Sequence, residues 1–122
     1  MTWQAKKEYA KALADYEKAV ELAGKESYAS TYYAALAMLR AGCPDDKIRD
    51  GDKALEAARK AHALAKGPAA MAALAAAHAE LGQFDKAVEW QEKAIVAAPQ
   101  GAKEPYRERL KKYQDRKPYR LE

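Results

Sequence analysis

The side chains best suited to metal binding or nucleophilic chemistry are one cysteine and two histidines, namely Cys43, His62 and His78. None of the spacings that bring zinc ligands together, such as CxxC, HxxxH or HExxH, occurs in the sequence. Cys43 follows an expected helix, whose negative end raises a thiol pKa instead of activating the thiol. The sequence also contains no set of nucleophile, base and acid and no phosphate-binding loop. We therefore expect no catalytic residue, no metal site and no cofactor, and a protein that is not an enzyme.

A second chemical candidate is a short acidic stretch, comprising Asp45, Asp46, Asp50 and Asp52. Its spacing does not fit a calcium-binding EF-hand loop, which needs acidic ligands at alternate positions and a final glutamate. Basic residues alternate with the acids in this stretch. The pattern favours helix capping and local ion pairs, with weak cation binding as the alternative.

Basic residues are concentrated at the end of the sequence. Residues 103–122 contain eight Lys or Arg and four Asp or Glu, so this segment carries the whole net charge of +4. A nucleic-acid-binding domain usually shows a basic stripe along its folded surface, so we do not expect nucleic acid as the partner. We expect a solvated capping helix here; the alternative is an electrostatic contact of 103–120 with nucleic acid or an acidic partner, through Arg107, Lys111 and Lys112.

The composition indicates an all-α protein. Thirty of the 122 residues are alanine, which has the highest helix propensity, and no alternating apolar run typical of a strand is present. No apolar run reaches the roughly 18–20 residues needed to span a membrane. A single cysteine and the absence of a signal-peptide core favour a cytoplasmic location.

Helix start and stop signals divide the chain into six expected helices. Stop signals stand at Gly24, Pro44, Gly67-Pro68, Gly82 and Pro99. Ser27 and Asp50 are candidate N-caps for the second and third helices. The expected helices cover residues 3–23, 28–41, 51–66, 69–81, 85–98 and 103–116.

An internal repeat underlies this division. A Lys-Ala pair is followed seven residues later by another, at Lys11-Ala12 with Lys18-Ala19, Lys53-Ala54 with Lys60-Ala61, and Lys86-Ala87 with Lys93-Ala94. Seven residues are about two helical turns, so both alanines of each copy lie on one helix face. A small residue there allows another helix to pack closely.

The most complete of the three copies resembles the tetratricopeptide repeat family through Leu74-Ala75, Gly82, Phe84, Ala87, Ala94 and Pro99. The resemblance implies a right-handed solenoid of antiparallel helix pairs, without catalytic chemistry, whose first helices line a concave groove for a peptide or partner helix. It divides a single domain, 1–122, into a partial first repeat (3–24), a second repeat (27–67) with an inserted loop (42–50), a third repeat (68–99) and a capping helix (103–118). The Cys-Pro-Asp loop, the Arg-Asp-Gly start of the next helix and the late Pro-Tyr-Arg also resemble C-terminal repeat segments of larger bacterial proteins. Because the first repeat lacks its first helix, we expect the chain to be an excised fragment.

Helical spacing gives the candidate groove residues, which are Thr31, Ala34, Ala35, Met38 and Ala41 from one helix and Ala69, Ala72, Ala73, Ala76 and Glu80 from the next. Members of this family that bind the C-terminal carboxylate of a peptide place Lys, Arg and Asn at such positions. None of these residue types occurs among the candidates, so we do not expect this mode of binding. The alternative is that the groove is only a packing surface in a spacer. We expect Tyr28, Tyr32, Tyr33, Trp3 and Trp90 to fill space between helices. The alternatives are that the three tyrosines are binding anchors and that Trp3 is exposed because its partner helix was cut away.

A second possible role is self-association. If the helix over 3–23 lacks its covering helix, its stripe of Tyr9, Leu13, Tyr16 and Val20 is partly bare, and exposed apolar patches favour association. The sequence thus predicts a protein-interaction module, with a homo-oligomer through the N-terminal face as an alternative.

Overall fold

The computed structural model describes residues 1–121 and contains only helices within them. The α-helices are α1 (Trp3–Ala23), α2 (Ala29–Gly42), α3 (Gly51–Leu64), α4 (Pro68–Glu80), α5 (Phe84–Ala97) and α6 (Lys103–Gln114), with a 3-10 turn at Gln100–Ala102. Every predicted helix is present, and its ends agree with the prediction to within two residues. The all-α prediction is confirmed. Glu122 lies outside the described residues, and within 1–121 no helix is both long enough and apolar enough to cross a bilayer.

The helix caps follow the sequence signals at α3 but not at α2. Asp50 caps α3 as predicted, because its carboxylate accepts a hydrogen bond from the Lys53 amide at 3.0 Å. Ser27 does not cap α2, which begins at Ala29 and has no side-chain cap. A backbone turn precedes α2 instead, in which the Ser30 amide donates to the Ser27 carbonyl at 3.1 Å. The backbone carbonyls of this turn accept hydrogen bonds from the first amide groups of α2, as a capping side chain would otherwise do.

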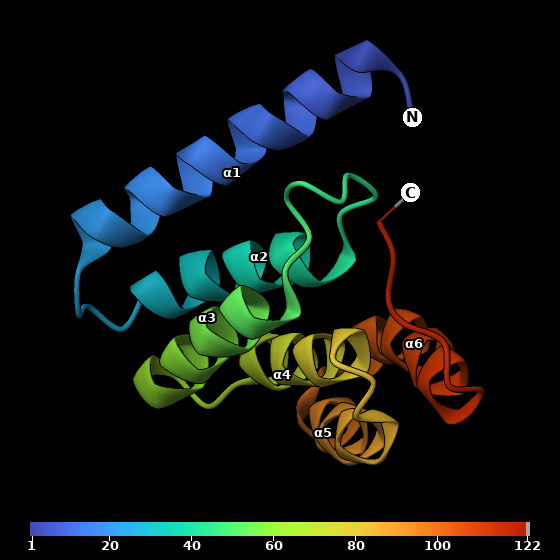
Figure 1. Cartoon of the computed structure of the whole chain (residues 1–122). Helices are drawn as coiled ribbons and strands as arrows, with labels where there is room; N and C mark the ends of the chain where they lie inside the picture. Colours follow the sequence, from blue (N-terminus) through green and yellow to red (C-terminus); the bar gives the residue numbers. More distant parts are fainter. Residues whose placement is uncertain (122) are drawn as a thin grey trace.

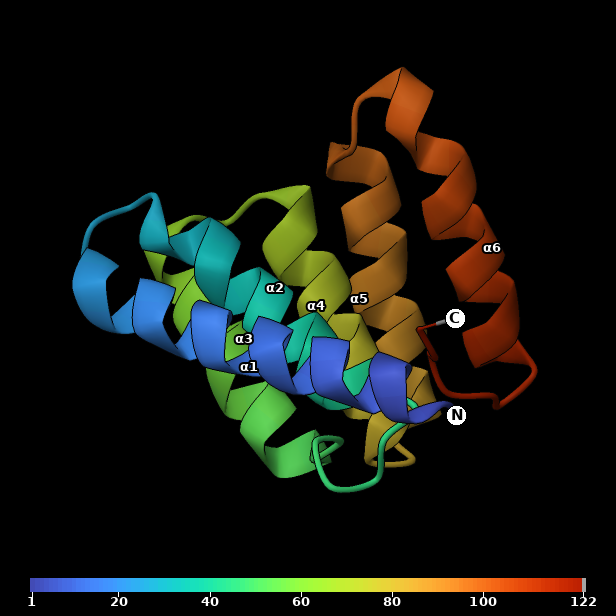
Figure 2. The ribbon, with the colours of Figure 1, turned by 90° about the horizontal axis from the view of Figure 1, so that it is seen from above.

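The helices form two antiparallel pairs, α2–α3 and α4–α5, and α4 packs against both helices of the first pair (Figure 1). α1 packs on α2 at one end, and α6 packs on α5 at the other (Figure 2). The main core is made almost entirely of alanine, with Ala34, Ala37, Ala57, Ala58, Ala61, Ala70, Ala73 and Leu74 buried together. Small side chains let these backbones approach closely, so the core depends on many close helix contacts.

The repeated alanines differ in burial between the copies. Ala54, Ala61, Ala87 and Ala94 are completely buried, whereas Ala12 and Ala19 in α1 are only half-buried. The difference arises because α3 and α5 pack against helices on two sides, whereas the main helix contact of α1 is with α2.

The apolar stripe of α1 faces into the molecule. Tyr9, Leu13 and Tyr16 pack against Leu39, Cys43 and Ile48, which belong to α2 and the following loop. The expected partial exposure of the stripe is confirmed, since its four residues are only half-buried, but the face does not lack a cover, because α2 and the 43–50 loop pack against it. The exposed large side chains of α1 are instead Trp3 and Leu22, which are 74% and 76% exposed.

The aromatic residues near the start of α2 mostly point to solvent. Tyr28 is 59% and Tyr32 39% exposed, and only Tyr33 packs against the core. The prediction that all three fill space between helices is wrong for the first two. Trp90 does pack against the core, whereas Trp3 does not.

After α6 the chain turns back across the molecule. Arg116 adopts a left-handed conformation with φ of 58°, and the Lys117 amide donates to the Lys112 carbonyl at 2.8 Å. The chain then runs to the end of α2, where the Leu121 amide donates to the Gly42 carbonyl at 2.8 Å (Figure 1). Residues 117–121, which we call the return segment, thereby link the end of α6 to α2.

Candidate partner-binding groove

A groove lies between α2, α4 and the C-terminal part of the chain. Its floor consists of Thr31, Ala34, Ala35 and Met38 from α2 and Ala69 and Ala72 from α4, and its volume is about 320 Å³. These positions were all expected from helical spacing, since α2 and α4 are neighbouring first helices of the two pairs. Small side chains along the floor leave room for a helix or an extended segment.

The wall of the groove was not foreseen from the sequence. It consists of Tyr106 and Arg109 from α6 and Tyr119 from the return segment. The Arg109 guanidinium lies 5.5 Å from the Tyr106 ring centre and 5.1 Å from that of Tyr119. Burial raises the pKa of Tyr119, so this phenol stays neutral at physiological pH. The groove therefore combines an apolar floor with an aromatic wall that carries one cation.

Three of the expected groove residues lie in the core instead. Ala41, Ala73 and Ala76 are fully buried between the helices, so none of these side chains reaches the groove. Their helix faces turn toward neighbouring helices because α4 packs against both α2 and α3.

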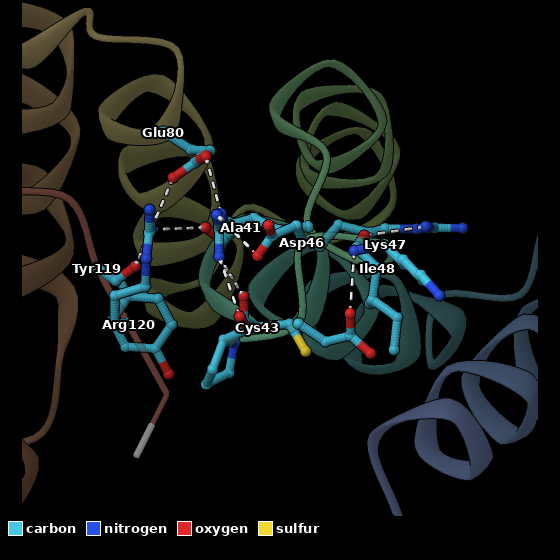
Figure 3. A network of polar contacts seen from close by, with 12 residues as sticks. Ala41, Cys43, Asp46, Lys47, Ile48, Glu80, Tyr119 and Arg120 are labelled. Carbon is cyan, nitrogen blue, oxygen red and sulfur yellow. Dashed lines mark hydrogen bonds and ion pairs between the residues drawn. The ribbon is translucent and has the colours of Figure 1, made fainter. Parts of the chain in front are cut away.

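Glu80 lies outside the groove lining and has another role. Its carboxylate accepts a 2.7 Å hydrogen bond from Arg120 Nη1 and lies 3.3 Å from Arg49 Nε (Figure 3). Arg49 also donates to the Cys43 carbonyl at 2.8 Å. One carboxylate thus joins α4 to the 43–50 loop and to the return segment. No local sequence pattern indicates this network, because its members are far apart in the chain and belong to different elements.

Cys43, His62 and His78 are not brought together. The Cys43 thiol is fully buried, and burial raises its pKa, in the direction expected from the sequence. His62 packs edge-on against Trp90 with ring centres 5.2 Å apart, and burial lowers its pKa. His78 Nδ1 lies 2.7 Å from the side-chain oxygen of Gln83. Within residues 1–121, no three His, Cys, Asp or Glu side chains are arranged to hold a metal ion.

The acidic stretch makes the local contacts that were expected. Asp45 accepts a hydrogen bond from the Lys47 amide at 3.0 Å, and Asp46 lies 3.7 Å from Arg49. Asp50 caps α3, as described above.

Several basic groups of the C-terminal region are already engaged within the chain. Arg107 lies 3.7 Å from Glu104, and Lys103 Nζ donates to the Ile95 carbonyl at 2.6 Å. Lys111 and Lys112 are exposed on α6. The three candidate contact residues, Arg107, Lys111 and Lys112, are therefore all exposed on α6, whereas Lys103 is bound within the chain.

Two buried polar side chains hold α6 in place. Gln91 of α5 is fully buried, and its amide donates to the Tyr106 carbonyl at 2.9 Å. Tyr113 is fully buried beside Ala75, Ala79 and Ala87, and burial raises its pKa. These contacts set the distance between α6 and α4, and hence the position of the groove wall. A buried glutamine gives no recognisable signal in the helical pattern.

Comparison with known families gives one match. Residues 68–100, which cover α4 and α5, match the model described as "Tetratricopeptide repeat". Neither the comparison with curated proteins nor the comparison with solved structures gives a significant match. The matched segment contains all the residues of the third repeat that resemble this family, from Leu74 to Pro99.

Proposed function

Because residues 68–100 are a tetratricopeptide repeat, a unit that generally mediates protein–protein interaction, we propose that this chain is a non-enzymatic interaction module. Its groove between α2, α4 and α6 binds a peptide or a partner helix. The observation that carries this proposal is the groove itself, which has an alanine-rich floor and a wall of Tyr106, Arg109 and Tyr119.

The division into repeats is part of the same proposal. α1 packs on α2 as α3 packs on α4, so α1 is the second helix of a partial repeat. The pairs α2–α3 and α4–α5 are the second and third repeats, with the 43–50 loop inserted in the second. α6 occupies the place of the next first helix and acts as the cap.

Ala69 offers the sharpest test of the groove. It lies on the groove floor and is exposed, whereas Ala72 is only 3% exposed and would not accept a larger side chain without disturbing the core. Peptides selected from a random library on the wild-type chain are titrated against the Ala69→Arg variant. We expect their affinity to fall by at least about tenfold, because the new side chain fills the floor.

Ala63→Arg is the matched control. Ala63 is exposed on α3 and does not line the groove, so this variant should bind the selected peptides normally. If the library yields no binder, or only binders that tolerate Ala69→Arg, the groove is not the recognition surface.

Self-association through the α1–α2 end is a second candidate, favoured by a specific surface. Leu22, Tyr28 and Tyr32 are 76%, 59% and 39% exposed, and they line a shallow hollow together with Ala19 and Ala23. Leu36-Ala37 in the second repeat corresponds to Leu74-Ala75 in the third, 38 residues later, and the same offset aligns Tyr32 with Ala70. Ala70, on α4, is buried against alanines of the preceding helix pair, α2–α3. The equivalent position on α2, Tyr32, therefore lies where a preceding helix would pack.

Sedimentation velocity over a range of concentrations tests this second candidate. We expect a concentration-dependent dimer that Leu22→Ser weakens and that Val96→Ser, a change at an equally exposed residue of α5, leaves intact. A monomer at every concentration would rule the dimer out.

A further inference from the structure

The return segment is held against the ends of α2 and α4 by the contacts of its side chains. It contains no regular secondary structure, and residues 118–121 are all half-buried. The surface beneath it is formed by the ends of α2 and α4, including Ala41, Gly42 and Glu80, together with Arg109 of α6. We call this surface the return-segment site.

The first anchor is aromatic. Tyr119 packs against the alanine cluster of Ala41, Ala76 and Ala77 and lies beneath the Arg109 guanidinium. Its ring lies against Gly42 so closely that a Cβ atom at that position would overlap with it. Glycine at the end of α2 therefore leaves room for an aromatic ring.

The second anchor is an arginine. Arg120 donates from Nη1 to the Glu80 carboxylate at 2.7 Å and lies 3.5 Å from the Ala41 carbonyl (Figure 3). Glu80 is held in place from the other side by Arg49, and its side chain is 18% exposed. A partly buried carboxylate with a fixed orientation is a selective acceptor for a guanidinium group.

The third anchor is an aliphatic side chain with a backbone contact. Leu121 packs beside Leu39, Cys43 and Ile48, and its amide donates to the Gly42 carbonyl at 2.8 Å. That carbonyl lies at the end of α2, where helix carbonyls lack partners within the helix. An extended strand of another chain could satisfy it in the same way.

We propose that the return-segment site is a recognition site for an extended peptide with the order aromatic–arginine–aliphatic. Residues Tyr119–Leu121 are its resident occupant, and a partner protein binds by presenting the same order in their place. This inference deepens the proposed function, because it names the side chains that a partner peptide would present. It rests on that function only in treating the molecule as an interaction module.

The arrangement implies competition between the chain and its partner. A segment tethered to its own site has an effective local concentration in the millimolar range for a short flexible linker. The wild-type chain should therefore bind a free peptide of this type weakly, and a chain whose own anchors are removed should bind it better.

The test uses full-length variants and a fluorescein-labelled peptide of residues 115–121, titrated by fluorescence anisotropy. The double variant Tyr119→Ala/Arg120→Ala changes no residue within a helix and removes two anchors. We expect it to bind the peptide about tenfold more tightly than the wild-type chain does. Adding Glu80→Gln to this double variant should weaken the binding about tenfold, because the charged acceptor for the arginine is lost.

Three controls make the outcome decisive. A peptide carrying Arg120→Gln should bind the double variant poorly, and Glu56→Gln, at an exposed carboxylate on α3, should leave peptide binding unchanged. Glu80→Gln in the wild-type chain should leave the binding of library-selected groove peptides unchanged, since Glu80 lies outside the groove lining. The last control separates a failure of this inference from a failure of the groove proposal.

Absence of peptide binding to a double variant with wild-type helicity by circular dichroism would overturn the inference. Equal binding of the Arg120→Gln peptide would also overturn it. Loss of helicity in the double variant would do the same, because it would show that the return segment is required for folding and is not a replaceable occupant.

Discussion

Glu80 and Arg120, which are 40 residues apart in sequence, share a 2.7 Å hydrogen bond that ties the end of α4 to the return segment. The same carboxylate lies 3.3 Å from Arg49, so it also holds the loop that covers Cys43. The Glu80 side chain therefore links α4, the 43–50 loop and the return segment, which share no backbone hydrogen bonds with one another within the described residues.

The first prediction concerns access to Cys43. In Glu80→Gln the ion pair with Arg49 is lost, so the 43–50 loop should open more often and the buried thiol should react faster with Ellman's reagent. We expect an increase of severalfold in the labelling rate under native conditions. Glu56→Gln is the matched control, since its carboxylate pairs only with exposed Lys60. Equal labelling rates in the two variants would show that Glu80 does not hold the loop.

The second prediction concerns the close contact between Gly42 and Tyr119. Alanine is a better helix former than glycine, by up to about 1 kcal/mol in a helix interior. At Gly42, however, the added methyl group would overlap with the Tyr119 ring, and such overpacking typically costs about 1–3 kcal/mol. We expect Gly42→Ala to lower the free energy of unfolding measured in urea.

Gly101→Ala is the control for this prediction, because no atom lies within 4 Å of a Cβ placed at Gly101. This variant should be as stable as the wild type or slightly more so. A Gly42→Ala variant that is stabilised to the same extent would contradict the contact.

The third prediction concerns the alanine-rich core. Leu74 is 3% exposed and is the one leucine among the buried residues of the largest cluster. Its truncation in Leu74→Ala should cost about 2–5 kcal/mol of unfolding free energy, since neighbouring alanines cannot fill the cavity. Leu22→Ala, at a residue 76% exposed, should change stability by less than about 0.5 kcal/mol. Urea denaturation followed by circular dichroism measures both, and similar values for the two would contradict the packing described.

The fourth prediction concerns Tyr113 at high pH. Burial raises its pKa above the ordinary value of 10.0, so the folded chain keeps the phenol proton at a pH where the unfolded chain has lost it. The stability that this proton provides is complete below pH 10 and falls as the pH rises above it. We expect the unfolding free energy of the wild type to decrease above pH 10 more steeply than that of Tyr113→Phe.

At neutral pH the same substitution should be neutral or slightly stabilising. The Tyr113 hydroxyl is buried and makes no hydrogen bond within the described residues, so phenylalanine removes an unpaired polar group. Urea denaturation at pH 7 and pH 11 measures both effects. A large loss of stability at pH 7 would show that the hydroxyl has a partner.

The sequence by itself determined the helices, their order and six of the ten residues expected along the groove. Gly, Pro and Asp signals mark the helix ends locally, and the alanine spacing defines which faces of α3 and α5 are buried. These properties follow from contacts within a few helical turns, so a local pattern contains them.

Only the tertiary structure decided the groove wall and the return-segment site. Gln91, Tyr113 and Arg109 are ordinary residues of their helices, and their roles arise from the distance between α4, α5 and α6. Glu80 contacts Arg120 because the chain turns back at Arg116, and it contacts Arg49 because the 43–50 loop lies beside the end of α4. Contacts between residues so far apart depend on how whole helices pack, and no periodicity along the chain records that packing.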